Sequence, residues 1–380
     1  MGQRLAVNQL HFQSFRGRAT LMNWIHARMR IVKRLLIATI AVLLLFMLFG
    51  TVWTVFKKRG EIDPLPESEV ERTVTEKGNS YKLHKGHLYR VNPQSKKWEF
   101  AQQVYDPDFY DKNYIERDGA IFRKAPNGEP VPVKRSFSDD FEGVTHLREL
   151  IDLRRGWTAC ELQSPRAPAV KDYVQLRNRI MKREADFLDN RIEPSAENVH
   201  QGTTALKFVS VPPSPGMVTA KSSLSTELVH FVKGDDVWMS LWCYVPAASG
   251  MPFTVLDLET TWINQHPGMR IVIEDGKHAC FQLKAFEHPY YRQPKGQEVE
   301  FPKGRWVHLK AHLQLTEQPD GVIELWQDGQ KIIDTHGQTL VLAKTIYNSF
   351  EVGISAYNEK QKTATLYLDD VSISDQPIQD

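Results

Sequence analysis

The sequence predicts a mainly β protein: a sandwich of two antiparallel sheets that follows a single N-terminal transmembrane helix and a small repeated β-hairpin module. Three observations support this prediction. The stretch Leu35–Phe56 is long, apolar and free of charged residues. Beyond residue 136, short segments with alternating apolar and polar residues follow one another, separated by Gly, Pro, Asp and Asn turns. Almost no helical pattern interrupts these segments, which favours packed antiparallel sheets.

The composition limits the classes of function. The 380-residue chain has a formal net charge of +2, with 25% charged and 41% hydrophobic residues. Lys and Arg are not clustered over a domain in the way typical of a nucleic-acid-binding surface, so we expect no nucleic-acid partner. The three cysteines, Cys160, Cys243 and Cys280, are too few for a disulfide framework. Cys243 and Cys280 lie in apolar segments and are expected to be small buried thiols.

The first element in chain order is Leu35–Phe56, whose 22 residues carry no charge. A helix of this length, at about 1.5 Å per residue, crosses the roughly 30 Å hydrocarbon core of a lipid bilayer. The segment lacks the small-residue cleavage site of a signal peptide, so we expect an uncleaved anchor. Residues 1–34 hold seven basic and no acidic residues, whereas several acids soon follow the segment. The positive-inside rule then predicts a single-pass protein with residues 1–34 in the cytoplasm and the main domain in the periplasm or outside the cell.

A linker and a short repeat come next. Residues 57–75 contain two prolines and many acids, which is typical of an extended linker. In residues 76–135, a pattern of strand, Gly-containing turn and strand begins at Tyr81 and recurs 33 positions later at Tyr114. Two copies of one β-hairpin are therefore expected. Because two hairpins bury little apolar surface, this module should pack on a neighbouring domain or on a partner chain.

Residues 136–380 are expected to form the sandwich. The Asp328-Gly329 turn, between two apolar segments, is the clearest hairpin signal. Trp326, just before it, is expected to point into the core, although Glu324 shares its face of the strand. One helix is expected over Ala169–Phe187. The expected strands are Ala205–Ser210, Val237–Val245, Phe253–Leu258, Met269–Glu274, Ala279–Lys284, Trp306–Leu315, Val322–Gln327, Phe350–Ser355 and Thr365–Ile373.

Several segments resemble one family of enzymes. They are Phe137–Gly143, Ser225–Leu228, Val237–Trp242, Gly304–Leu309, Gly321–Gly329 and Leu366–Val371. Together they resemble the concanavalin A-like jelly rolls of the heparin lyase I and glucuronan lyase type, over roughly residues 137–374. The resemblance implies a jelly-roll fold and a polysaccharide ligand. Lyases of this type remove the proton next to a uronate carboxylate and eliminate the 4-linked sugar. Arg, Gln, Asn or His neutralises the carboxylate, and Tyr or His serves as base and acid.

The positions that carry this chemistry in the related alginate lyases differ in this chain. The resemblance places Ser225 where those lyases have Arg, which removes a bidentate clamp for the carboxylate. The segment Val255–Glu259 offers acids where they have Gln and His, and Ser355 stands at the position of their Tyr. Standard lyase catalysis is therefore not expected, unless Tyr347 or Tyr357 substitutes from nearby.

The same acids suggest a comparison with retaining glucanases of this fold, in which a Glu-x-Asp-x-Glu strand directs alternate carboxylates into the cleft. Val255 stands at the position of the nucleophile, so covalent glycosidase chemistry is not supported. Asp257 and Glu259 could still face the concave side of the sheet. There they would bind sugar hydroxyls or pair with Arg270.

Two loops contain further candidate ligands for a sugar. Aromatic side chains beside Arg, Gln and His suit sugar stacking and hydrogen bonding. A protein interface uses the same residue types, and the aromatics could also pack only their own loops. The predicted carbohydrate-binding residues are Asp257, Glu259, Trp262, His266, Arg270, Tyr290, Tyr291 and Arg292.

Acids also cluster at the two ends of the sandwich sequence. Asp139 and Asp140 lie in the first strand and Asp370 in the last, and these strands lie close together in such jelly rolls. Clustered carboxylate oxygens are typical calcium ligands, so a structural calcium ion held by these three residues is one interpretation. Acids at strand ends that simply face solvent are the other. No other cofactor is expected, because no phosphate-binding loop or zinc signature occurs.

The expected function is that of a membrane-anchored, extracytoplasmic protein that binds a polysaccharide or takes part in envelope assembly, without standard lyase catalysis. Its expected partners are the lipid bilayer, a polysaccharide, and other envelope proteins or a second copy of itself. The alternative is an active polysaccharide lyase or glycan hydrolase with relocated catalytic residues. A third class is a structural subunit of an envelope assembly, in which the hairpins and the anchor make the contacts.

Overall fold

The computed structural model describes residues 61–62, 67–76, 79–92, 94, 97–125, 128–285 and 289–379. The expected cytoplasmic segment 1–34 and transmembrane helix Leu35–Phe56 lie outside these residues. Within the described ranges, no helix is long and apolar enough to cross a membrane. The chain divides into two compact units. Of the described residues, the smaller holds those up to Val70 and those within Thr75–Lys82 and Leu88–Gln102. The larger holds the described residues of Glu71–Val74, Leu83–His87 and Gln103–Asp380.

The smaller unit contains most of a five-stranded sheet with the strand order β1-β5-β4-β3-β2. Its strands are β1 (Glu61–Ile62), β2 (Arg72–Glu76), β3 (Asn79–His84), β4 (His87–Val91) and β5 (Trp98–Gln103), with a short 3-10 helix, η1, at Glu67–Glu69. Strands β3 and β4 form the first of the two expected hairpins. Its turn, Lys85-Gly86, has φ values of 45° and 77°, the left-handed pair that suits a type I′ turn.

The second expected hairpin belongs to the larger unit. It consists of β6 (Tyr114–Arg117) and β7 (Ala120–Lys124), and its Asp118-Gly119 turn has φ values of 53° and 76°. The helix α2 (Phe109–Asn113) precedes it, and β8 (Pro130–Pro132) completes a three-stranded sheet. The repeat in the sequence therefore corresponds to two hairpins with the same turn geometry, in two different sheets.

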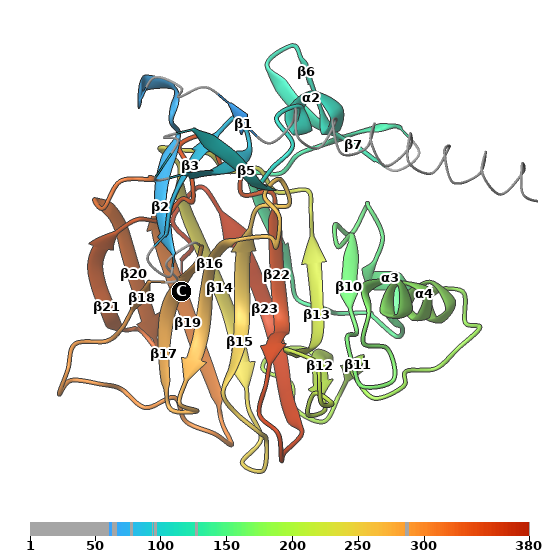
Figure 1. Ribbon diagram of the computed structural model, residues 1–380. Coiled ribbons are helices and arrows are strands. Elements are labelled where there is room, and N and C mark those ends of the chain that lie inside the picture. Colours follow the sequence, from blue (N-terminus) through green and yellow to red (C-terminus); the bar gives the residue numbers. More distant parts are fainter. Residues whose placement is uncertain are drawn as a thin grey trace, which may run out of the picture. The chain divides into compact units, whose positions relative to one another are not determined.

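The rest of the larger unit is a sandwich of two antiparallel sheets, which Figure 1 shows one behind the other. The first sheet has the order β10-β13-β22-β15-β16-β17-β18 and the second β11-β12-β23-β14-β19-β20-β21, with β9 paired to β23. The first comprises β10 (Ala159–Glu161), β13 (Ala220–Thr226), β15 (Phe253–Glu259), β16 (Gly268–Glu274), β17 (His278–Lys284), β18 (Tyr290–Tyr291) and β22 (Ser349–Tyr357). The second comprises β9 (Ser136–Asp139), β11 (Arg191–Ser195), β12 (Ala205–Ser210), β14 (Asp236–Tyr244), β19 (Trp306–Gln314), β20 (Gly321–Gln327), β21 (Gln330–Gly337) and β23 (Ala364–Ser374). The expected mainly β sandwich is confirmed.

Two helices lie at the edge of the sandwich formed by β10 (Figure 1). They are α3 (Leu147–Leu150) and α4 (Val170–Met181), the second of which falls within the helix expected over Ala169–Phe187. Tyr173, Leu176 and Ile180 form the buried stripe of α4. This spacing of three and four residues keeps the apolar side chains on one face of the helix.

The core lies between the two large sheets, where alternate residues of facing strands meet. Gly353 on β22 has a φ of 116°, and a Cβ atom there would lie 2.6 Å from the ring of Phe208 on β12. This glycine therefore allows the two sheets to approach each other. The three cysteines are buried and free, so the expected buried thiols are confirmed.

The expected position of Trp326 is wrong. Ile323 and Leu325 are fully buried, whereas Trp326 is only half-buried and lies on the outer face of β20. The Nζ atoms of Lys310 and Lys331 lie 5.6 and 5.1 Å from the centroid of its ring. The odd-numbered residues of this strand fill the core, and the indole packs among the stems of long charged side chains instead.

Candidate functional site

The register of the first sheet aligns a row of polar residues across six strands. Their Cα partners run from Ser225 on β13 through Glu351 on β22, Asp257 on β15, Arg270 on β16 and Gln282 on β17 to Tyr290 on β18. Residues directly opposite each other in antiparallel strands point to the same face of the sheet. The intervening Leu256 and Leu258 of β15 are buried in the core, so the polar row faces away from it.

This outer face of the first sheet forms a cleft of about 500 Å³. We refer to it as the concave cleft. Its polar lining includes Lys221, Asp257, Glu259, Arg270, Gln282, Lys284, Tyr290, Ser355 and Tyr357. Cations, carboxylates and tyrosines from six strands thus meet in one depression.

Three carboxylates form a cluster at the concave cleft, and two of them, Asp257 and Glu259, line it. Asp257 and Glu259 come from alternate positions of β15, and Glu351 lies opposite Asp257 on β22. One oxygen from each lies within 4.8 Å of the other two. The residues are only 3%, 4% and 4% exposed, respectively. Buried like charges at this distance repel one another, so the cluster needs protons or cations to balance it.

Serine hydroxyls satisfy part of this carboxylate cluster. Ser355 donates to Oδ2 of Asp257, and Ser223 donates to Oε1 of Glu351. The other oxygen of Asp257, Oδ1, is buried and has no hydrogen-bond partner among the described residues. A buried carboxylate oxygen without a hydrogen-bond donor destabilises the folded protein. Oδ1 of Asp257 is such an atom.

Two lysines flank the cluster. Lys284 donates to Oε1 of Glu259 at 2.9 Å. Burial, and next the Asp257 carboxylate, nevertheless raise the pKa of Glu259 to about 7. Burial also raises the pKa of Glu351 well above its usual range. Burial opposes the charge of Lys221, but the surrounding carboxylates, Glu351 first among them, raise its pKa. The cluster therefore retains protons at a pH at which ordinary carboxyl groups have lost them.

The far side of the concave cleft carries Arg270 and Tyr290, and Arg292 contacts the ring of Tyr290. Arg270 donates its Nε and Nη2 atoms to Oε1 of Gln282, the first at 2.7 Å. Arg292 donates to both oxygens of Glu274 at 2.6 Å, and its guanidinium lies 4.5 Å from the ring centroid of Tyr290. Tyr290 itself is 38% exposed. An exposed ring at the rim of a cleft is suited to stacking on a ligand.

The structure brings together four of the eight residues considered for sugar binding: Asp257, Glu259, Arg270 and Tyr290. The other four are Trp262, His266, Tyr291 and Arg292. Arg292 does not line the concave cleft, but it contacts Glu274 and the ring of Tyr290, which do. His266 is exposed on its loop.

Trp262 and Tyr291 are held by other parts of the larger unit. Trp262 is 8% exposed, lies 4.4 Å from Tyr105 between ring centroids, and donates Nε1 to the carbonyl of Asp106 at 2.9 Å. The hydroxyl of Tyr291 donates to the carbonyl of Gln338 at 2.9 Å. Trp262 therefore anchors its own loop, and Tyr291 anchors β18.

The two tyrosines considered as substitute catalysts are also engaged. Tyr347 is fully buried and donates its hydroxyl to the carbonyl of Thr339 at 2.6 Å. Tyr357 lines the concave cleft, but its hydroxyl donates to the carbonyl of Lys362. Burial raises the pKa of both phenols above the usual value. Both phenols therefore hold their protons near neutral pH.

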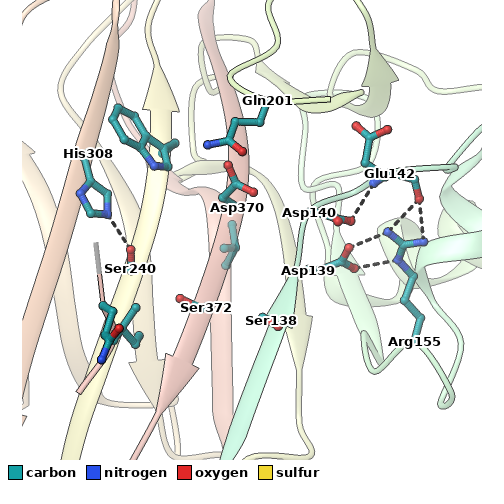
Figure 2. Close-up of a pocket in the computed structure, with 14 residues that line it drawn as sticks. Ser138, Asp139, Asp140, Glu142, Arg155, Gln201, Ser240, His308, Asp370 and Ser372 are labelled. Carbon is teal, nitrogen blue, oxygen red and sulfur yellow. Dashed lines mark hydrogen bonds and ion pairs between the residues drawn. The ribbon is translucent and has the colours of Figure 1, made fainter. Parts of the chain in front are cut away.

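The acids considered for calcium line a second hollow of about 650 Å³, shown in Figure 2. Strands β9 and β23 are neighbours, as expected, and Asp139, Asp140 and Asp370 all border this hollow. Figure 2 shows Arg155 directed at Asp139, whose carboxylate it binds through Nε and Nη2 at 2.7 and 2.5 Å. Oδ2 of Asp370 and Nδ1 of His200 form a hydrogen bond of 3.0 Å. A guanidinium thus already balances Asp139, and calcium at this place stays a prediction.

Glu351 is the main site residue that the sequence pattern did not reveal. It lies in the segment Phe350–Ser355, whose last residue was the one considered for chemistry. Because residues four apart on a strand share a face, Glu351 could have been placed beside Ser355 on the cleft side. Its position opposite Asp257 follows only from the strand register.

This chain is similar to one protein family and to several solved structures. The family model described as polysaccharide lyase matches residues 171–372, which is more than half of the chain. No curated protein matches. Among solved structures, the endo-β-1,4-glucuronan lyase from the fungus Trichoderma reesei is 15% identical, with a TM-score of 0.43 over 63% of this chain and 95% of that chain. The cellulose-induced protein Cip1 is 16% identical, with a TM-score of 0.42 over 64% of this chain and 99% of that chain.

The alginate lyase Aly36B is a third similar structure, 11% identical, with a TM-score of 0.37 over 65% of this chain and 100% of that chain. The family match is the finding that decides the assignment. It begins in α4, ends in β23 and includes every strand that carries an acid of the cluster. This chain belongs to the polysaccharide lyase family.

Proposed function

We propose that this protein binds a polysaccharide in the concave cleft and that it does so without the conventional elimination chemistry of lyases. The observation that carries the proposal is the cluster of Asp257, Glu259 and Glu351 at the concave cleft. Elimination builds negative charge next to a uronate carboxylate, and lyases stabilise that charge with cationic or amide donors. Losing one such donor typically costs about 3–4 kcal/mol of transition-state stabilisation. Three carboxylates at this place would add repulsion to that loss.

The charges in the concave cleft also limit the kinds of glycan that can bind there. Buried carboxylates accept hydrogen bonds from hydroxyl groups and, more strongly, from ammonium groups. They repel the carboxylates of a polyuronate. Arg270, Gln282 and the exposed ring of Tyr290 supply donors and a stacking surface on the other side of the cleft. We therefore propose a neutral or amino-sugar polymer as the ligand.

Glycoside hydrolysis is a second candidate, favoured by the close approach of the carboxylates. Retaining glycosidases use two carboxyl groups about 5–5.5 Å apart, one protonated and one ionised. Glu259, with a pKa of about 7, would serve as the acid, and Asp257, which accepts a hydrogen bond from Ser355, would be the second carboxyl group. Hydrolysis would release new reducing ends without unsaturated sugars, whereas elimination would produce unsaturated sugars.

We further propose that Leu35–Phe56 anchors the chain in a membrane with the binding domain outside the cytoplasm. The uncharged stretch and the basic residues before it support this proposal. A reporter that is active only outside the cytoplasm, fused after Asp380, should be active. Activity from an N-terminal fusion instead would reverse the orientation.

The central experiment measures binding and turnover on the same purified full chain. Alginate, glucuronan, heparin, a neutral glucan and chitosan are compared by calorimetric titration, with absorbance of unsaturated uronates and reducing-end release as activity readouts. We expect binding of the glucan or chitosan and no unsaturated product from any polymer. Elimination on a polyuronate that is lost in Tyr357→Phe would overturn the proposal. Reducing-end release that is lost in Glu259→Gln would replace it by hydrolysis, and chains that co-purify without any glycan binding would favour an assembly role.

A further inference from the structure

We infer that Asp257, Glu259 and Glu351 form a binding site for a divalent cation with oxygen ligands, and that calcium is the ion that fits it. The inference goes beyond the proposed function, because it concerns an ion and requires no glycan. It also differs from the calcium position expected at Asp139, Asp140 and Asp370, which lies in the other hollow of the sandwich.

The spacing of the three carboxylates suits one shared ion. Calcium binds oxygen ligands at roughly 2.3–2.6 Å, so two oxygens on opposite sides of one ion are about 5 Å apart at most. The three oxygens of the cluster all lie within 4.8 Å of one another. They come from two adjacent strands in the middle of a sheet, which holds them in place with little freedom to separate.

An unpartnered buried atom points to a missing ligand. Asp257 is 97% buried, since its exposed fraction is 3%, and its Oδ1 atom has no hydrogen-bond partner in the described part of the chain. Its other oxygen accepts from Ser355. A cation at the cluster would bind the remaining oxygen and remove the penalty of leaving it unsatisfied.

The charge at the cluster also matches a divalent ion. Three carboxylates carry three negative charges when they are ionised. Among the described residues, the ammonium bonded to them is that of Lys284, on Glu259. Lys221 lies nearby but forms its ion pair with Glu161, at 2.7 Å. The excess of two negative charges is the amount that one divalent cation neutralises.

The donor chemistry favours a hard cation. The cluster offers carboxylate oxygens, with the hydroxyls of Ser223 and Ser355 beside them, and none of its members is a histidine or a cysteine. Calcium and magnesium prefer such ligands, whereas zinc and copper prefer nitrogen and sulfur. Calcium also accepts irregular geometry, which magnesium does not. Asp257 and Glu259 line the concave cleft, so an ion can reach them from solvent.

The test is a calorimetric titration of the full chain with calcium chloride after chelator treatment and dialysis, at fixed ionic strength. We expect saturable binding of one ion and a melting temperature that rises with calcium concentration, because the ion binds only the folded state. Asp257→Asn and Glu351→Gln should each weaken binding at least about tenfold, since even residues behind a metal ligand contribute that much. Magnesium chloride should bind more weakly than calcium chloride.

Asp334→Asn is the matched control, because it removes an exposed acid on β21 that lines neither hollow. It should leave calcium affinity unchanged. Melting in the presence of chelator identifies any variant that fails to fold, and Glu351→Gln provides an independent second variant. Two results would overturn the inference: no saturable calcium binding by the wild-type chain, or binding that survives both Asp257→Asn and Glu351→Gln. Loss of that surviving binding in Asp140→Asn would place the ion in the second hollow instead.

Discussion

Replacing Asp257 by Asn in chelator-treated protein measures the repulsion within the carboxylate cluster. One oxygen of Asp257 lies within 4.8 Å of oxygens of Glu259 and Glu351. Two unit charges at about 5 Å repel by roughly 3 kcal/mol at an effective dielectric constant of about 20. Protons retained by the two glutamates reduce this repulsion, and Asn still offers Ser355 an acceptor. We therefore expect Asp257→Asn to raise the free energy of unfolding by about 1–2 kcal/mol near pH 8.

The stabilisation by Asp257→Asn should increase as the pH rises. The pKa of Glu259 is about 7 in the folded protein, against an ordinary value of 4.5, because burial and Asp257 raise it while Lys284 and Lys221 lower it. Folding therefore takes up a proton between these two pH values. The stability from this group is fully present below the ordinary pKa and is lost as the pH rises through about 7. Asp257→Asn lowers the pKa of Glu259, so the stability of the variant should fall less steeply over this window.

The assay is urea unfolding of both proteins at about pH 5 and about pH 8 with chelator present. The difference between variant and wild type should be largest at the higher pH and small at the lower one. Asp334→Asn is a suitable control, since this exposed acid on β21 lies in the other sheet and its loss should change stability little. A variant that is less stable than the wild type near pH 8 would refute the idea that repulsion dominates the cluster.

Two further predictions concern residues on either side of the sandwich. Arg155→Met should lower the free energy of unfolding by about 3 kcal/mol, because it leaves the Asp139 carboxylate, which is 4% exposed as a side chain, with Trp157 as its remaining side-chain donor. Urea unfolding measures this, and adding Asp139→Asn should recover part of the loss; a change below about 1 kcal/mol would contradict it. Tyr290→Ala should weaken glycan binding several-fold at unchanged melting temperature, whereas Trp262→Ala should mainly lower stability, by about 3 kcal/mol or more. The opposite pattern would place the sugar on the loop of Trp262 instead of at the cleft rim.

The strands of the sandwich were predictable where apolar and polar residues alternate without interruption. The expected strand Ala205–Ser210 has the same bounds as β12, and most others differ from the structure by one or two residues at their ends. Strand β13 was not identified as a strand because both faces of its middle are polar. Ser222 bonds to Ser210 across the core, and Ser223 bonds to Glu351 on the cleft side. A buried hydrogen-bonded pair of serines in the core removes the alternation on which such predictions depend.

Only the site residues that lie on a single strand could be predicted from the sequence. Asp257 and Glu259 alternate with leucines, so their exposure to the cleft follows from the period of two. Glu351 joins them through the pairing of β22 with β15, and strand order is a property of the whole fold. The burial of Trp262 likewise depends on Tyr105 and Asp106, which belong to a segment far away in the sequence. A loop with an aromatic residue looks the same from sequence whether its ring binds a ligand or packs inward.

The residues that stand at the positions of the lyase catalytic groups contact one another in this structure. Asp257, Glu259 and Ser355 occupy positions where the resemblance places amide, histidine and tyrosine side chains, and the structure joins them to Glu351 through one cluster and a direct hydrogen bond. The excess negative charge of this cluster must be balanced by protons, by a cation or by a cationic group of the ligand. The proposed calcium ion and the proposed amino-sugar ligand would satisfy the same acids. Calcium should therefore compete with chitosan for the concave cleft, but a neutral glucan bound through Tyr290 and Arg270 need not be displaced.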